Sequence, residues 1–154
     1  MNRILRGLLA LIVFVQATAY SAQLNDLQAG RVAAIVGQIL EGHHFRRTRL
    51  DDVASSSFLT NYVNALDYNH MIFLQSDIEA FKTKYGARLD DSIKSGSISP
   101  AFQIFDVYLE RLEERNILVQ KLLKQEFDFT EDDEFIAARN KEPWPKDDAE
   151  SAKL

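Results

Sequence analysis

The residues best suited to chemistry are three histidines, whose imidazole nitrogens could bind a metal ion. His43 and His44 are adjacent, and His70 lies far from both in the sequence. Adjacent histidines do not share one face of a helix, and neither has a second ligand four residues away. The chain also has no cysteine, so it lacks thiolate ligands and a cysteine nucleophile. This pattern favours histidines in loops, and we predict no metal-binding residue and no cofactor.

Carboxylates gather at Asp90–Asp91 and in the acidic run at residues 128–134, and such clusters could bind calcium. A calcium loop of the common helix–loop–helix type needs a glycine at its sixth position and a glutamate at its twelfth. Residues 128–139 contain no glycine, and they end in alanine and arginine where the closing glutamate should stand. Helix capping explains these acids better than calcium binding does.

Hydroxyl groups cluster at Ser55–Ser57, where a serine nucleophile could act. The cluster lies in a predicted helix, without the glycine-flanked turn or the basic partner that activate a serine. No glycine-rich loop follows a strand, so a phosphate-binding loop is also excluded. We therefore predict no catalytic and no cofactor-binding residue in this chain.

One basic cluster, at residues 46–49, is the remaining candidate for binding. It has one aromatic neighbour, Phe45, and the chain as a whole carries a net charge of -5. A nucleic-acid-binding domain normally has a basic surface, so this composition predicts no nucleic-acid partner. The cluster is typical of a solvated loop, and in an exported protein it could contact an acidic partner.

Helices must position all of these groups, because apolar residues recur at helical spacing almost throughout the chain. The fold class we predict is all-α, an irregular bundle of about four to five helices. The expected helices run from Leu24 to about Glu41, from Asp51 or Asp52 to Leu66, from Asp77 to Tyr85 with a continuation past Gly86 to Ile93, and from Ser99 to about Glu126.

Local signals refine these boundaries. Asp51 or Asp52 can cap the second helix, and Ser76 with Glu79 has the spacing of a capping box. Ser99 followed by a proline is the strongest helix start in the chain. Residues 67–70 have the composition of a turn, and the apolar run at 71–74 is expected to be buried in extended form.

The long helix after Ser99 carries charges of both signs on its polar side, a pattern that indicates a solvated face with pairs between charges four residues apart and not a binding site. Its charged residues include Glu110, Arg111, Glu113, Glu114, Arg115, Lys121 and Lys124. Further along the chain, two prolines fix extended backbone on both sides of Trp144. Residues 146–148 could start another helix, although we expect the chain to fray beyond Lys146.

The N-terminus has the pattern of a secretory signal peptide. Arg3 and Arg6 precede an apolar run at residues 8–15, and small residues then offer cleavage after Ala19 or after Ser21. The apolar run is shorter than the roughly 20 residues that span a membrane, although an uncleaved anchor is the alternative. We expect residues 1–19 to be the signal peptide and residues 20–154 to form one periplasmic domain with no membrane span.

Two stretches resemble the N-terminal domain of the tail-specific, or carboxy-terminal processing, protease family. Residues 62–81 follow the family's order of an aromatic-led Leu-Asp turn, an apolar pair and then Ser-Asp-Ile with a phenylalanine three residues later. The second stretch is Asp128-Phe129-Thr130, followed by Pro143-Trp144-Pro145-Lys146. The resemblance extends over residues 26–150.

Full-length members of the family are periplasmic serine endoproteases with a PDZ domain and a Ser–Lys catalytic dyad. The resemblance implies that this chain covers only the helical N-terminal domain, so no residue inherits the catalytic serine, the lysine or the PDZ loop. It also implies a scaffold role, with the remaining protease domains, a lipoprotein adaptor and unfolded protein substrates as partners. The alternative is a stand-alone periplasmic protein-binding module, and the sequence leaves open whether the chain is a gene fragment.

Overall fold

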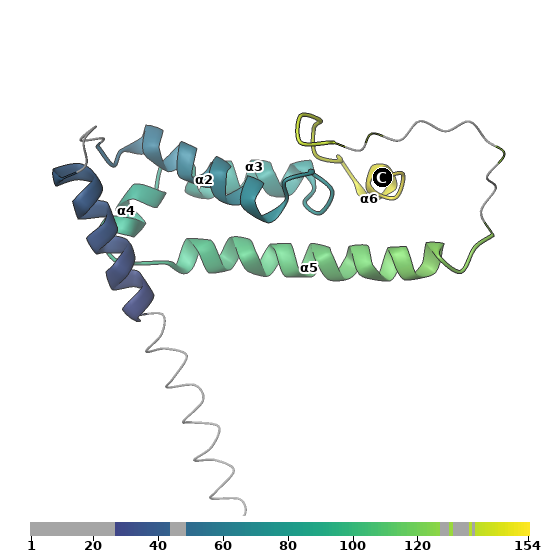
Figure 1. Ribbon diagram of the computed structural model, residues 1–154, viewed down its shortest axis with the longest axis horizontal. Coiled ribbons are helices and arrows are strands. Elements are labelled where there is room, and N and C mark those ends of the chain that lie inside the picture. The colour runs from purple at the N-terminus through teal and green to yellow at the C-terminus, as the bar shows by residue number, and fades with distance from the viewer. Residues whose placement is uncertain (1–26, 44–48, 127–129, 131–135, 137) are drawn as a thin grey trace, which may run out of the picture. The chain divides into compact units, whose positions relative to one another are not determined.

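The computed structural model describes residues 27–43, 49–126, 130, 136 and 138–154. It confirms the all-α fold class, since the described residues form helices, turns and extended connections but no strand. None of the helices in these ranges combines the length and apolar character needed to cross a membrane. The helices are residues 27–42, α2 (Asp52–Leu66), α3 (Gln75–Tyr85), α4 (Leu89–Lys94), α5 (Ser99–Leu122) and α6 (Asp148–Ser151) (Figure 1).

The chain divides into two compact units, and the described part of the first comprises residues 27–43 and Arg49 together with Asp91–Ile98. Within it, the helix at 27–42 lies against the turn that follows α4. Gly30 and Gly96 meet backbone to backbone, and a Cβ atom added at Gly30 would overlap the carbonyl oxygen of Gly96. Gly96 also has a φ angle of 71°, in the left-handed region that glycine adopts without strain.

The second unit comprises Leu50–Asp90 and Ser99–Leu154, and its core lies between α2, α3 and α5 (Figure 1). Phe73 is at the centre and is completely buried, with its ring edge-on to Phe81 of α3 and to Tyr108 of α5. The burial expected for the run at 71–74 is confirmed at Phe73 and Leu74, and Leu74 has the expected extended backbone, whereas Ile72 and Phe73 lie in a bend. The core residues are Leu59, Val63, Phe73, Ile78, Phe81, Tyr85 and Ile104.

The start of α2 agrees with the sequence, and the start of α3 corrects it. Asp51 caps α2, since its Oδ1 accepts from the backbone N–H groups of Val53 and Ala54. The predicted capping box of Ser76 and Glu79 is wrong. The N-cap of α3 is Leu74, and the Asp77 carboxylate three residues later accepts from the Leu74 N–H at 2.9 Å. Because α3 starts at Gln75, the reaching-back position falls on Asp77.

The predicted continuation of this helix to Ile93 is also wrong. α3 ends at Tyr85, a turn follows in which the Arg88 N–H donates to the Tyr85 carbonyl, and α4 begins at Leu89. The turn brings Asp90 to α2, where the buried Ser55 Oγ accepts from the Asp90 N–H at 2.8 Å. A straight helix could not make this contact.

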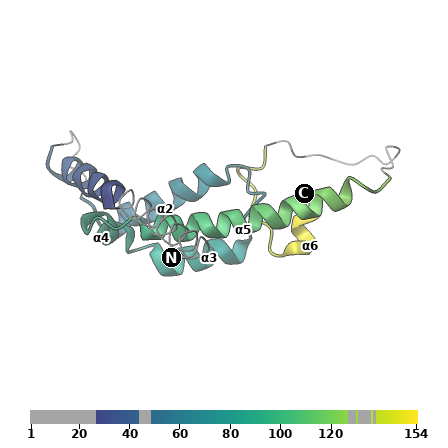
Figure 2. The ribbon, with the colours of Figure 1, turned by 90° about the horizontal axis from the view of Figure 1, so that it is seen from below.

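The C-terminal part of the second unit is more ordered than we expected. α5 ends at Leu122 rather than near Glu126. The helix start predicted at residues 146–148 is confirmed, because Asp147 caps α6 by accepting from the Glu150 N–H. The expected fraying beyond Lys146 is wrong. α6 lies beside the C-terminal half of α5 in both views (Figure 1 and Figure 2), and Arg115 of α5 donates to the Ser151 carbonyl.

Candidate functional site

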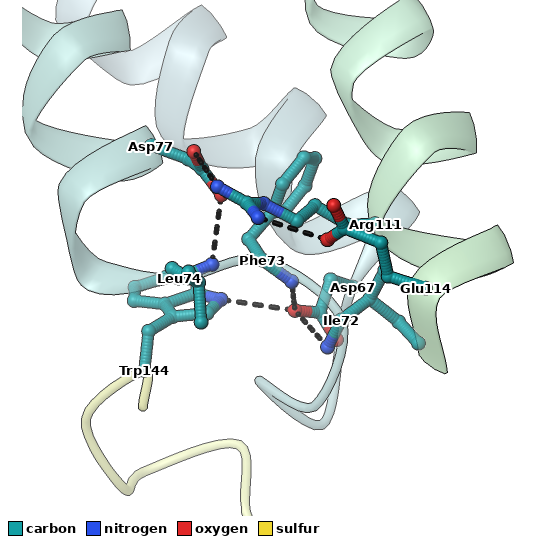
Figure 3. A network of polar contacts seen from close by, with 8 residues as sticks. All are labelled: Asp67, Ile72, Phe73, Leu74, Asp77, Arg111, Glu114 and Trp144. Atoms are coloured by element: carbon teal, nitrogen blue, oxygen red, sulfur yellow. Dashed lines mark hydrogen bonds and ion pairs between the residues drawn. The ribbon is translucent and has the colours of Figure 1, made fainter. Parts of the chain in front are cut away.

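The most developed polar site in the described residues is built around Asp67, at the C-terminus of α2 (Figure 3). Only 4% of this residue is exposed. Its Oδ1 accepts from the N–H of Met71 at 2.8 Å, and its Oδ2 accepts from the N–H groups of Ile72 at 3.0 Å and Phe73 at 3.1 Å. A buried carboxylate is tolerated when N–H donors satisfy its oxygens. Asp67 therefore fixes the turn that buries Phe73.

A fourth donor comes from a distant part of the chain. The indole Nε1–H of Trp144 donates to Asp67 Oδ2 at 3.0 Å. The Trp144 ring stacks on the His70 ring with centroids 3.6 Å apart, and His70 Nδ1 donates to the Glu142 carbonyl at 2.5 Å. His70 has a φ angle of 53°, so the turn predicted at 67–70 places this histidine in the left-handed region.

The prolines beside Trp144 complete this attachment. Pro145 is fully buried, and its carbonyl accepts from the N–H of Gln75, the first residue of α3, at 2.8 Å. The first N–H groups of a helix have no partner within the helix, so this bond satisfies one of them. Asn140 adds a bond to the Tyr68 hydroxyl at 2.8 Å. The segment 140–145 is thereby fastened to the ends of α2 and α3, and we call this arrangement the Asp67–Trp144 clamp.

A second polar contact joins α3 to α5 (Figure 3). Arg111 donates through Nε and Nη2 to the two oxygens of Asp77, at 2.8 and 3.0 Å, and through Nη1 to Glu114 at 2.9 Å. The pKa of Arg111 is raised above its ordinary value, chiefly by the bond to Asp77, while partial burial acts in the opposite direction. The interpretation of this side of α5 as a solvated face is therefore wrong for Arg111, whose partner within the helix, Glu114, lies three residues away and not the four expected.

A pocket of about 350 Å³ lies where α5, α6 and residues 72–74 meet. Its lining is mixed, with apolar side chains such as Leu74 and Leu118 beside the arginines Arg111 and Arg115. The guanidinium of Arg111 is engaged by Asp77 and Glu114, and one nitrogen of Arg115 is engaged by Ser151. The two arginines that line the pocket are thus already engaged in contacts within the protein.

The predicted hydroxyl cluster is split by the fold. Ser55 is completely buried, and its Oγ donates to Asp90 Oδ1 at 2.7 Å. Ser57 is exposed, and its Oγ donates to the Val53 carbonyl within α2. A hydroxyl that is sealed from solvent and bonded to a carboxylate serves as a link between α2 and α4.

Comparison with known proteins identifies the family of the chain. The family model described as the tail-specific protease N-terminal domain matches residues 35–154. The chain belongs to this family. A relative from Haemophilus influenzae named tail-specific protease is 39% identical over 111 residues, which make up 72% of this chain. The matched part is 16% of that relative, so the chain spans a small fraction of the length of the protease it matches.

The two stretches that resemble the tail-specific protease N-terminal domain family contain residues of the Asp67–Trp144 clamp. The stretch 62–81 holds Asp67, His70 and Asp77, and the later stretch holds Trp144 and Pro145. The clamp brings the two stretches together. Asp128 and Phe129, quoted for the same resemblance, lie outside the described residues.

The other candidate residues from the sequence do not gather into a site. His43 follows the helix at 27–42, whereas His70 lies in the clamp. Among the residues that the structure describes, no group of three or more His, Cys, Asp or Glu side chains could hold a metal ion. Most of the acidic run at 128–134 and of the basic cluster at 46–49 lies outside the described residues, and Arg49 is exposed.

Sequence reasoning missed the roles of Asp67, Arg111 and Arg115. Their partners lie 77, 34 and 36 residues away, at Trp144, Asp77 and Ser151. Helical periodicity reports only on neighbours three or four residues apart, so it carries no signal for such contacts. The available hint was the resemblance itself, which contained Asp67, Asp77 and Trp144 together.

Proposed function

We propose that this chain is the non-catalytic N-terminal scaffold of a tail-specific serine endoprotease, where it helps to enclose substrate and to dock an adaptor. Its family membership supports the proposal, together with the small share of the Haemophilus influenzae protease that it matches. The observation that carries it is the Asp67–Trp144 clamp, in which the buried polar groups bind one another. Buried polar groups that are fully hydrogen-bonded to one another hold the packed helices rigidly in place.

The proposal includes protein partners, namely the remaining protease domains, a lipoprotein adaptor and unfolded substrates. Exposed apolar side chains along the helix at 27–42 support contact with another protein surface, because a run of them is uncommon on a free monomer. Between 48% and 59% of each of these residues is exposed: Leu27, Val32, Ile35, Val36 and Ile39.

The proposal also places the protein in the periplasm after removal of residues 1–19. Two arginines followed by the apolar run at 8–15 and then by small residues support export. Fractionation of cells that express the full chain, with N-terminal sequencing, tests this. A periplasmic product that begins at Tyr20 or Ala22 is expected, and an uncut cytoplasmic protein would contradict export.

A chimera tests the scaffold role. The matched segment of the Haemophilus influenzae protease is deleted, or replaced by residues 35–154 of this chain, and cleavage of an unfolded protein substrate is measured. Deletion should reduce cleavage, and replacement should restore it. A replacement that carries Asp67→Asn should restore less, because the wall is weakened. A deletion that leaves cleavage unchanged would refute the scaffold role and favour the stand-alone binding module.

A further inference from the structure

α5 has a second apolar face in addition to the one that packs in the core. Ile104, Val107 and Tyr108 contact the core. A separate stripe is left exposed, with between 36% and 63% of each residue accessible, and it consists of Phe102, Phe105, Leu109, Leu112 and Val119 of α5 together with Leu123 in the turn directly after it. Apolar residues exposed singly are ordinary, but a continuous stripe on one helix indicates an interface.

The spacing of this stripe is that of a two-stranded coiled coil. From Phe102 onward its positions follow one another alternately three and four residues apart, which are the a and d positions of a heptad. One position in the series, between Leu112 and Val119, is polar, and Asn116 occupies it in an exposed place on the helix. We infer that α5 pairs with α5 of a second copy of this chain, in parallel and in register.

Asn116 is the first argument for a second copy in parallel orientation. An asparagine at an a position costs stability unless it meets a polar group across the interface, and it then fixes the register. In a parallel, in-register pair, Asn116 meets Asn116 of the other copy. In an antiparallel pair the a positions face d positions, so each Asn116 would face Leu112, or Phe105 in the shifted register, and two amide groups would lack partners in an apolar seam.

Charge supplies a second argument. In the antiparallel register that sets Asn116 against Leu112, the two copies of Glu113 would lie close together beside the seam. Like charges across an interface are unfavourable. In the parallel pair, Glu113 instead faces Tyr108, and Gln120 faces Arg115, by the usual heptad relation between flanking positions. The parallel arrangement therefore avoids both the unpaired Asn116 amides and the repulsion between Glu113 residues. The inference does not depend on the proposed protease function.

Sedimentation of the purified protein over a range of concentrations is the first test, and a reversible dimer is expected. Leu112→Glu should abolish the dimer. Ile117→Glu is the matched control, because Ile117 is 61% exposed but lies off the stripe, and it should leave the dimer intact. Circular dichroism checks that both variants keep their helices. A monomer at every concentration, or equal losses in the two variants, would overturn the inference and favour a partner of different sequence.

Orientation is tested with a single thiol, which the chain allows because it has no cysteine. Val119→Cys should cross-link to itself with a short bis-maleimide, and Glu110→Cys, on the outer side of the helix, should not. In the antiparallel register that sets Asn116 against Leu112, two Val119 residues would be about 15 Å apart along the helix axis, at 1.5 Å per residue. Cross-linking of Val119→Cys in a mixture only to Leu109→Cys or to Phe102→Cys, the positions opposite it in the two antiparallel registers, would refute the parallel arrangement.

Discussion

The indole N–H of Trp144 donates to the carboxylate of Asp67, which lies 77 residues earlier in the chain. The bond joins the end of α2 to the segment that precedes α6, and it adds a fourth donor to a carboxylate that already accepts from three backbone N–H groups. The turn at 71–73 and the segment that holds Trp144 are thereby fixed to the end of α2 through one side chain.

Replacement of this carboxylate should be costly. Asp67→Asn places an amide NH₂ group among N–H donors, so at least one buried donor loses its acceptor. We expect the free energy of unfolding to fall by about 3 kcal/mol, the range for breaking a buried hydrogen-bond network. Urea denaturation followed by circular dichroism measures the loss. Glu110→Gln, at an exposed position on α5, is the control, and an equal effect there would contradict the argument.

Trp144 is the only tryptophan of the chain, so its fluorescence reports on the clamp. If the clamp is part of the core, fluorescence and circular dichroism should show the same unfolding midpoint. His70→Asn removes the ring stacked on Trp144 and keeps a residue type that tolerates the left-handed backbone. We expect it to lower stability by about 1–2 kcal/mol and to shift both midpoints together. A fluorescence midpoint well below that of the helices would show that the clamp opens separately.

Arg111→Lys should weaken the link between α3 and α5, because lysine cannot form the two parallel bonds to Asp77. The expected loss is about 1–2 kcal/mol. Asp77→Asn should cost more, since Asp77 also accepts from the Leu74 N–H at the start of α3. The double variant should be less destabilised than the sum of the two single losses. Strict additivity would show that the pair contributes little energy of its own.

The sequence predicted the features of the fold that depend on residues close together in the chain. The periodicity of α2 and α5, the Asp51 cap and the turn at 67–70 depend on contacts within a few residues, and the structure confirms them. The sequence could not show that Arg111 contacts Asp77. A charged residue on a helix face of mixed charge has the same local sequence pattern whether its side chain is solvated or forms an ion pair. The start of α3 was misplaced for a related reason, since Pro145 supplies an acceptor to its first N–H.

Tyr62 gives the fold a dependence on alkaline pH. Burial raises the pKa of Tyr62 above its ordinary value of 10.0, and its hydroxyl donates to the Ala101 carbonyl at the start of α5. The unfolded chain therefore loses this proton first as the pH rises. The stabilisation by Tyr62 is complete below the unfolded-state pKa, and it declines as the pH passes through the folded-state pKa.

Tyr62→Phe should consequently lower stability at neutral pH by about 1 kcal/mol and flatten the decline above pH 10.0. Urea midpoints measured from neutral to alkaline pH test this prediction. Tyr68→Phe, at an exposed tyrosine, controls for the loss of one phenol and should preserve the slope. A slope unchanged in Tyr62→Phe would show that other groups cause the alkaline loss.

The close approach of Gly30 and Gly96 should make the first unit sensitive to a single methyl group. Gly30→Ala places a Cβ atom onto the Gly96 carbonyl oxygen, and the contacting atom is backbone, so the segments must separate. Gly42→Ala is the matched control, because nothing lies within 4 Å of a Cβ added there. On helix propensity alone, each change favours the helix by up to about 1 kcal/mol. Hydrogen exchange should therefore become faster at residues 91–98 in Gly30→Ala but not in Gly42→Ala, and protection retained in both variants would refute the contact.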